Sequence, residues 1–269
     1  MHDLFTVESF DLEKTYEYIL SIQVSLSGFS FLVKSPNENK FLAYKNISVK
    51  ISNNSVLSRH FNEWLKTEEL LHKPFKKVRV IVLNEYFSLV PEVYFQNSVK
   101  NFVSKYLFEE NTEFELAENI IHSLKSKLIF ALPSGLNALI QNLIGVCEIV
   151  HPVKLILNNL PEISKVNGLV LFFESKNFYT VLFNHQTIVM VNSFKMLHSN
   201  DVLYYVHTLL KQLAISTKQT TLFISYSAAQ TSNFEVSLKS SFSDIQHLDP
   251  VFDFSNKQQT VPFTLNCNS

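Results

Sequence analysis

Residues 21–33 read SIQVSLSGFSFLV, and this stretch decides how the chain starts its fold. Apolar residues alternate with small polar residues on both sides of Gly28, which is typical of two half-buried strands joined by a turn. The segment KFLAYKNISVKI at residues 40–51 predicts a third strand. The chain therefore begins with three strands, of which the first two form a hairpin.

A helix is expected directly after these strands. Residues 52–71 carry apolar side chains at helical spacing, and the candidate caps are Asn53, Asn54 and Ser55. Trp64 lies within this helix and is expected in the core. The segment KKVRVIVLN at residues 76–84 then predicts a buried strand.

The same order of elements returns about 150 residues later in the chain. Residues 168–183 (GLVLFFESKNFYTVLF) predict a second hairpin, and residues 186–196 predict a third strand. A capped helix at 199–215 and a buried strand at 220–227 follow. Either the elements recur by chance, or the chain is a duplicated α/β fold with a cleft between its halves.

Between the two repeats, alternating strands and helices are expected. In chain order, the expected elements are an extended segment with a bend at Pro91 (86–95), a helix (96–108), two strands (117–124 and 126–133), a helix with Ser134 as cap and Gly145 as stop (134–145), a short strand (147–152) and a helix started by Pro152.

The composition excludes some functions. The chain has 269 residues, enough for one large domain or two ordinary ones, and 46% of them are apolar. A net charge of −1 argues against a general nucleic-acid binder. The chain has only two arginines, Arg59 and Arg79, and only four glycines, whereas average usage gives roughly 19 glycines. Loops that hold phosphate need glycine, so such loops are scarce here.

The cysteines and the N-terminal segment indicate a cytosolic protein. Cys147 and Cys267 form no CxxC pair, which fits a reducing compartment. The first residues are acidic without an apolar run, which is unlike a secretory signal. No apolar run reaches the length needed to span a bilayer, so we expect no direct membrane insertion.

The repeated unit of three antiparallel strands, a helix and further strands resembles the actin-like ATPase, or ribonuclease H-like, fold. Its layout is similar to the pilus-assembly and cell-division branch of that superfamily, which carries a small subdomain inserted in the first half. The resemblance implies an α/β fold with mixed sheets, a first half at 1–165 with the insertion at about 85–132, and a second half at 166–269. The whole chain resembles an uncharacterised bacterial family of unknown function with this fold.

The resemblance also implies where a nucleotide site would lie. Active members place Asp and Gly in the first hairpin, where this chain has Gln23 and Ser25. In the second hairpin they again use Asp and Gly, where this chain has Glu174 and Ser175. They use paired glycines beside the adenine, a place at which Tyr226 and Ser227 stand here. Tyr226 would fill the adenine space, so we expect a degenerate cleft.

Other polar residues allow two interpretations each. Glu174 and Lys176 form either a residual polar site or a solvated turn, and the turn is favoured. Glu148 and His151 form either an acid–base pair or a plain strand-end polar pair, and the plain pair is favoured. None of the nine histidines has metal-ligand spacing to another histidine or a cysteine, so no metal site is expected.

Aromatic residues suggest where a protein partner would bind. Those of the second hairpin are expected in the core, although an exposed subset would make a binding patch. The segment YFSLVPEVYF is the first candidate surface, and a packed edge hairpin is the alternative. Its candidate contact residues are Tyr86, Phe87, Val90, Tyr94 and Phe95. The polar end of the chain, residues 256–269, is expected to be a partly ordered tail.

Three functions are compatible with these observations. The first is a non-catalytic actin-like protein, a pseudo-ATPase without cofactor, that binds a cytosolic or membrane-associated protein. The alternative is an atypical nucleotide-binding ATPase or kinase that uses ATP and Mg²⁺ with Glu174 and Gln23 in a rearranged cleft. The third is a sensor whose cleft holds another small molecule.

Overall fold

The computed structural model describes residues 3–108, 113–163, 167–184, 187–227, 238–255 and 257–267. These residues form two compact units. Unit 1 comprises Met1–Lys154 and Val251–Gln259, and unit 2 comprises Leu155–Pro250 and Thr260–Ser269. The division into halves at 1–165 and 166–269 stays a prediction.

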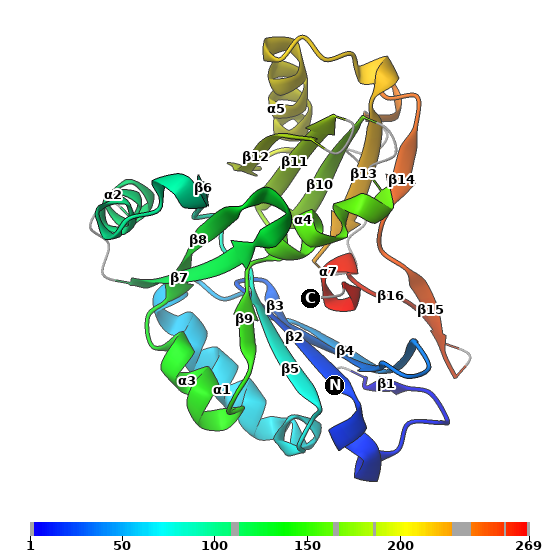
Figure 1. Cartoon of the computed structure of the whole chain (residues 1–269). Helices are drawn as coiled ribbons and strands as arrows, with labels where there is room; N and C mark the ends of the chain where they lie inside the picture. The colour runs from blue at the N-terminus through cyan, green and yellow to red at the C-terminus, as the bar shows by residue number, and fades with distance from the viewer. Residues whose placement is uncertain are drawn as a thin grey trace. The chain divides into compact units, whose positions relative to one another are not determined.

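Unit 1 is built on a six-stranded sheet in the order β1-β4-β3-β2-β5-β9 (Figure 1). Strands β1 to β4 pair antiparallel, whereas β2, β5 and β9 run parallel. The strands are β1 (Phe5–Thr6), β2 (Ile19–Ser25), β3 (Gly28–Ser35), β4 (Lys40–Ser48), β5 (Lys77–Val82) and β9 (Glu148–Val150). A 3₁₀ helix, η1 (Leu12–Glu17), precedes β2. The opening hairpin and its third strand are confirmed.

Two helices, α1 (Leu57–Thr67) and α3 (Leu136–Leu143), pack side by side on one face of this sheet (Figure 1). Short 3₁₀ helices flank α1, namely η2 (Asn54–Val56) and η3 (Glu69–His72). Alternate residues of β2 and β3 point to this face, where Trp64 stacks on Phe29 with ring centroids 5.1 Å apart. The expected core position of Trp64 is confirmed.

The predicted side-chain caps of both helices do not form, although Asn53 occupies the N-cap position of η2. The chain enters α1 through η2, and no side chain caps α1. Ser55 instead donates its hydroxyl to Asn53 Oδ1 at 2.6 Å. The N-cap position of α3 is Gly135 in the left-handed region, not Ser134. The predicted stop of α3 is correct, because Gly145 follows the last turn with a φ of 81°.

A separate three-stranded sheet, in the order β6-β8-β7, lies between β5 and α3 in the sequence. We call these three strands the inserted sheet. The segment that contains them comprises β6 (Phe87–Pro91), η4 (Glu92–Tyr94), α2 (Asn97–Phe108), β7 (Phe114–Ile121), η5 (His122–Leu124) and β8 (Ser126–Pro133). Val103 of α2 packs with Val90 and Ile129, which ties the helix to the strands.

Unit 2 repeats the strand order of unit 1. Its sheet runs β12-β11-β10-β13-β14, with β10, β13 and β14 parallel and α5 on one face (Figure 1). Its elements are α4 (Pro152–Ile163) from Leu155 onward, β10 (Gly168–Glu174), β11 (Asn177–Asn184), β12 (Thr187–Lys195), α5 (Ser199–Gln212), η6 (Thr217–Gln219), β13 (Thr221–Tyr226) and β14 (Ile245–His247). The recurrence of strand order is confirmed, while a common origin of the halves stays a prediction.

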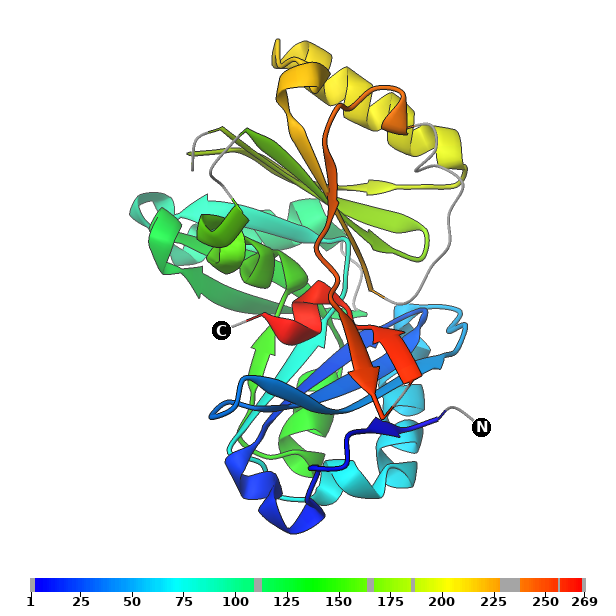
Figure 2. The ribbon, with the colours of Figure 1, turned by 90° about the vertical axis from the view of Figure 1, so that its right-hand side faces the viewer.

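The prediction of a C-terminal tail is wrong. The chain forms a hairpin of β15 (Val251–Phe254) and β16 (Lys257–Thr260), then a short helix, α7 (Phe263–Asn266). Figure 2 shows the hairpin beside the strands of unit 1, where Phe252 lies against Phe41 with ring centroids 4.9 Å apart. The polar composition of this segment does not indicate a folded structure, because the residues that anchor it are single buried side chains such as Phe254 and Leu265.

Candidate functional site

The end of β2 carries Gln23 and Ser25, the first pair of predicted cleft residues. Both lie on the same face of the strand as Ser21. Gln23 is buried and stands between Ser30 of β3 and Ile81 of β5. Ser25 is also buried and is the last residue of the strand. On the same face, Arg79 Nη2 donates to Ser21 Oγ at 2.8 Å. This end of the first sheet is therefore a row of buried polar side chains.

The Ser25 hydroxyl closes the hairpin turn. Its Oγ accepts the Ser27 backbone N–H at 3.1 Å and lies 3.2 Å from the Gly28 carbonyl oxygen. It also lies 2.8 Å from Ser27 Oγ. A side chain with three such neighbours is part of the turn itself.

Gly28 is required by the chain around it. Its φ is 135°, and an added Cβ would lie 1.9 Å from the backbone oxygen of Ile47. The space that the missing side chain leaves is filled by the end of β4. In this hairpin the glycine serves close backbone packing.

The ends of β10 and β13 carry the second group of predicted cleft residues. The Ser227 hydroxyl donates to Glu174 Oε2 at 2.5 Å, and the Ser227 N–H donates to the Phe173 carbonyl at 2.9 Å. Glu174 is 5% exposed, so the favoured interpretation of a solvated turn is wrong for this residue. Ser175 and Lys176 are exposed in the turn, with Ser175 at a φ of 48°.

Tyr226 belongs to the core of unit 2. Its ring stacks on Phe173 at 5.4 Å, within the cluster that also holds Leu209 and Leu210 of α5. Whether this ring occupies the place of an adenine stays a prediction. The residues 228–234 that follow in the motif lie outside the described residues.

Asp249 was missed in the sequence and ties three segments of unit 2 together. Its Oδ1 accepts the Ser225 hydroxyl at 2.6 Å and the Phe263 N–H at 2.8 Å, and its Oδ2 accepts the Tyr226 N–H at 2.7 Å. Burial raises the pKa of this carboxyl to about 6, although the three hydrogen bonds act in the opposite direction. No local pattern marks Asp249, because its partners lie 14 to 24 residues away along the chain.

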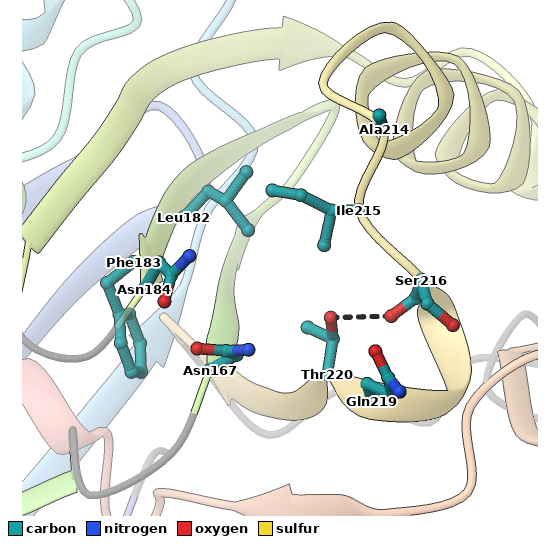
Figure 3. Close-up of a pocket in the computed structure, with 9 residues that line it drawn as sticks. All are labelled: Asn167, Leu182, Phe183, Asn184, Ala214, Ile215, Ser216, Gln219 and Thr220. Carbon is teal, nitrogen blue, oxygen red and sulfur yellow. Dashed lines mark hydrogen bonds between the residues drawn. The ribbon is translucent and has the colours of Figure 1, made fainter.

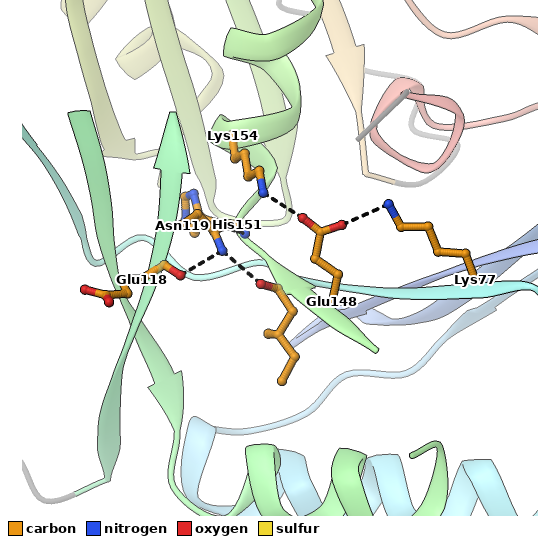
Figure 4. Close-up of polar contacts among 7 residues, drawn as sticks. Lys77, Glu118, Asn119, Glu148, His151 and Lys154 are labelled. Carbon is orange, nitrogen blue, oxygen red and sulfur yellow. Dashed lines mark hydrogen bonds and ion pairs between the residues drawn. The ribbon is translucent and has the colours of Figure 1, made fainter. Parts of the chain in front are cut away.

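Glu148 and His151 do not act on each other as an acid–base pair (Figure 4). Glu148 pairs with Lys154 Nζ at 2.6 Å and Lys77 Nζ at 3.4 Å. Burial acts to raise the pKa of the Glu148 carboxyl, but Lys154 and Lys77 together bring that pKa below its usual value.

His151 is fully buried and takes part in a different network (Figure 4). Its Nε2 lies 2.8 Å from the Asn84 carbonyl oxygen, and its Nδ1 accepts the Val153 N–H at 3.3 Å. Asn119 of β7 accepts the His151 N–H at 2.9 Å and donates to the Ile149 carbonyl at 2.9 Å. Burial lowers the pKa of the imidazole to about 4, so it stays neutral at pH 7. The network fastens the inserted sheet to the main sheet of unit 1.

The five candidate contact residues at 86–95 differ in exposure. Val90 is buried in the inserted sheet, which removes it from the candidate surface. Tyr86 packs edge-on against Phe114, Phe87 lies against His151, and Phe95 carries Lys127 Nζ 4.0 Å above its ring. Only Tyr94 among the five is largely exposed, at 69%.

Exposed apolar residues on the same segment were missed. Val93 next to Tyr94, and Phe102 and Tyr106 on the outer face of α2, are between 60% and 82% exposed. The rings of Phe102 and Tyr106 are tilted against each other, with centroids 4.3 Å apart. We call these four residues the η4–α2 surface. In contrast, the aromatic residues of the second hairpin are all buried, namely Phe172, Phe173, Phe178, Tyr179 and Phe183.

The described part of the chain lacks two further features. No group of three or more His, Cys, Asp or Glu side chains is arranged to hold a metal ion in it. Within the same residues, no helix has the length and apolar character needed to cross a membrane.

The fold places the chain among proteins with the actin-like ATPase fold. A Bacteroides thetaiotaomicron protein with this fold and unknown function superposes with a TM-score of 0.77 at 17% identity, over 88% of this chain and 93% of that chain. A chain of the PilM–PilN type IV pilus biogenesis complex superposes with a TM-score of 0.52 at 11% identity, over 86% of this chain and 88% of that chain. The predicted fold is thereby confirmed.

The chain belongs to DUF3822, a family of proteins of unknown function, whose model matches residues 7–242. No curated protein matches it in sequence.

Proposed function

We propose that this protein is a cytoplasmic interaction module that keeps the actin-like fold but carries out no nucleotide chemistry. The observation that carries this proposal is the set of hydrogen bonds made by the side chains of Ser25 and Glu174. The resemblance places both residues where active members handle phosphate and metal. In this chain the Ser25 hydroxyl closes its own turn, and the Glu174 carboxylate accepts the Ser227 hydroxyl.

The chemistry of these positions supports the proposal. Gln23 has no carboxylate with which to position a metal-bound water. Ser25 carries a Cβ where a phosphate would need close approach to the backbone. Gly28 is used against the Ile47 carbonyl, so it leaves no open backbone for an anion.

The η4–α2 surface is the docking surface that we propose for a protein partner. Exposed aromatic side chains on a folded element are costly in water and are enriched at protein interfaces. The contacting pair Phe102 and Tyr106 is held on a helix whose other face packs into the inserted sheet. Such an anchored aromatic pair is typical of residues that dominate binding.

The fold neighbour from the PilM–PilN complex supports an interaction role. That protein is found in a complex with another protein. At 11% identity the likeness extends to the fold alone, so the partner of this chain is not inferred from it.

Photo-crosslinking tests the docking surface. A photoreactive phenylalanine analogue replaces Tyr106 in one variant and Tyr16 in another, and both native tyrosines are exposed. We expect one discrete adduct with a second protein from position 106, no adduct from position 16, and loss of the adduct when Phe102→Asp is added. The same adducts from both positions would contradict the proposed surface.

A further inference from the structure

Strand β12 forms one edge of the unit 2 sheet. Its inner side pairs with β11, and no other strand in the described part of the chain pairs with its outer side. Strand β4 holds the equivalent place in the unit 1 sheet, and β1 pairs antiparallel with part of its outer side. A pocket of about 160 Å³ at the end of β11 is a separate feature, because no described residue of β12 lines it (Figure 3). Within the described chain, the edge that β1 covers in unit 1 is therefore uncovered in unit 2.

The pairing with β11 determines which backbone groups of β12 face outward. At the end of this ladder the Met196 N–H donates to the Lys176 carbonyl. Hydrogen-bonded pairs alternate with non-bonded pairs between antiparallel strands, so every second residue back from Met196 turns its N–H and C=O to β11. The odd-numbered residues of 191–195 turn these groups outward. In agreement, the Ser193 N–H is accepted by the exposed Asn192 side chain at 2.9 Å.

Aromatic and apolar side chains line the α5 face of this edge. Phe194 stacks on Tyr205 of α5 at 4.6 Å, and Tyr205 meets Tyr204 edge-on at 5.4 Å. Tyr204 is 66% exposed, and Met190 lies half-buried on the same face as Phe194. The only charged residue among the nine of β12 is Lys195, at its last position. A long, apolar edge strand with so little charge is a template for pairing with a further strand.

The side chains of β12 match those of a second β12 in one antiparallel register. With Asn192 on the two-fold axis, Met190 of one chain lies opposite Phe194 of the other on the α5 face. On the other face Val191 lies opposite Ser193, and both turn their N–H and C=O outward, as a bonded pair requires. Moving the axis by one residue in either direction would set the amide of Asn192 against Met190 or Phe194. The side-chain pattern therefore selects the register centred on Asn192.

The charges of the strand are compatible with the same register. Lys195 of each chain lies opposite the uncharged Val189 of the other chain. At 3.4 Å per residue, the two Lys195 residues are about 20 Å apart along the strands. This separation is more than twice the Debye length of about 8 Å at physiological ionic strength, so their repulsion is screened. No other charged residue lies on either strand.

We propose that β12 pairs antiparallel with β12 of a second copy of this chain, so that two unit 2 sheets join into one continuous sheet in a two-fold symmetric dimer. Val191 and Ser193 of the two chains exchange hydrogen bonds. The Asn192 side chain releases the Ser193 N–H and faces its equivalent across the axis. Met190 and Phe194 cover each other beside Tyr205. This interface lies on unit 2 and is distinct from the η4–α2 surface proposed for a different protein.

Sedimentation velocity of the full chain over a range of micromolar concentrations tests the dimer. Asn192→Lys and Asn192→Glu each place two like charges directly opposite each other at the axis, which destabilises the pairing. A one-to-one mixture of the two variants places Lys opposite Glu and removes that repulsion. Asn142→Lys, exposed on α3 in unit 1, is the matched charge control, and Asn192→Ala is the uncharged control at the axis.

We expect wild type, Asn192→Ala and Asn142→Lys to sediment as dimers. Asn192→Lys and Asn192→Glu should each sediment as monomers that keep the native near-UV circular dichroism signal, and their mixture should sediment as a dimer. A monomeric wild type would overturn the proposal and leave the edge to a strand of another protein. A dimer that Asn192→Lys leaves unchanged, or a mixture that stays monomeric, would overturn it as well.

Discussion

At the residue scale, polar side chains at strand ends serve the structure of their own unit. Ser25 closes a turn, Glu174 accepts from Ser227, and Asp249 joins three segments. The sequence pattern cannot distinguish such residues from catalytic ones, because both kinds are polar residues at the ends of buried strands. The difference lies in the hydrogen-bond partners, and most of these are distant in sequence.

Gly28 should be the least replaceable of the described glycines in turns. In Gly28→Ala the new Cβ would meet the Ile47 carbonyl oxygen, so backbone must move. We expect a loss of about 3 kcal/mol or more in the free energy of unfolding, measured by denaturant titration. Gly145→Ala is the control, because its φ is also positive but nothing lies within 4 Å. It should cost about 1 kcal/mol, and equal costs would contradict the role of the Ile47 contact.

Asp249 should make stability depend on pH in a defined direction. At pH 7 the carboxyl is ionised in both the folded and the unfolded chain. Because its pKa is about 6 when folded and 3.8 as a model value, the folded chain binds the proton first as pH falls. Relative to Asp249→Asn, wild type should therefore gain about 2 kcal/mol between pH 7 and pH 4.

The buried imidazole of His151 acts in the opposite direction over a similar range. Its pKa falls from 6.5 to about 4 on folding, so the unfolded chain takes up the proton first and stability falls on acidification. Both chains of the Asp249 comparison keep His151, so subtracting their urea unfolding curves isolates the carboxyl. A constant difference from pH 7 to pH 4 would show that the pKa of Asp249 is not raised.

At the element scale, periodicity located the strands and most helices. Alternation with small polar residues marked β2 and β3, and the buried runs marked β5, β10 and β13. Helix starts were less predictable, because the chain enters α1 through a 3₁₀ turn and enters α3 through Gly135. The exposure of Phe102 and Tyr106 was also not predictable. One face of α2 packs on the strands, and apolar residues occupy the other face as well, so the pattern does not show which face is exposed.

Asn119 should hold the inserted sheet in place. Asn119→Ala removes the acceptor of the buried His151 N–H and the donor to the partly buried Ile149 carbonyl. We expect a loss of about 2–3 kcal/mol in unfolding free energy. Hydrogen exchange should show faster exchange at His151 and in β7. Asn192→Ala, on the exposed face of β12, should change stability by less than about 0.5 kcal/mol, and similar effects of the two variants would refute this role.

At the scale of the whole molecule, the recurrence of three strands, a helix and a strand was enough to predict the fold. The path of the C-terminal segment was not predictable. The chain passes from unit 2 to unit 1 at Val251 and returns at Thr260. Because that passage rests on a few buried side chains within a polar sequence, its composition resembles a tail.

Deletion of residues 251–269 should prevent stable folding. It removes the buried side chains of Phe254, Val261 and Leu265, each worth about 1.5–3 kcal/mol. That sum approaches the whole stability of an ordinary domain, about 5–15 kcal/mol. Near-UV circular dichroism of the truncated chain should lose its native signal. The exposed substitution Gln258→Ala is the control, and a truncated chain that melts at the wild-type temperature would contradict the packing described.

The central claim is that the chain does not use a nucleotide, and a thermal-shift titration with ATP and Mg²⁺ tests it most directly. A ligand at 100 times its dissociation constant stabilises the folded state by about 2.7 kcal/mol, which moves Tm by several degrees. We predict no saturable shift at millimolar ATP, with or without Mg²⁺, in wild type or in Glu174→Ala. A saturable, Mg²⁺-dependent shift in wild type that Glu174→Ala abolishes would contradict the account and identify a nucleotide-binding enzyme.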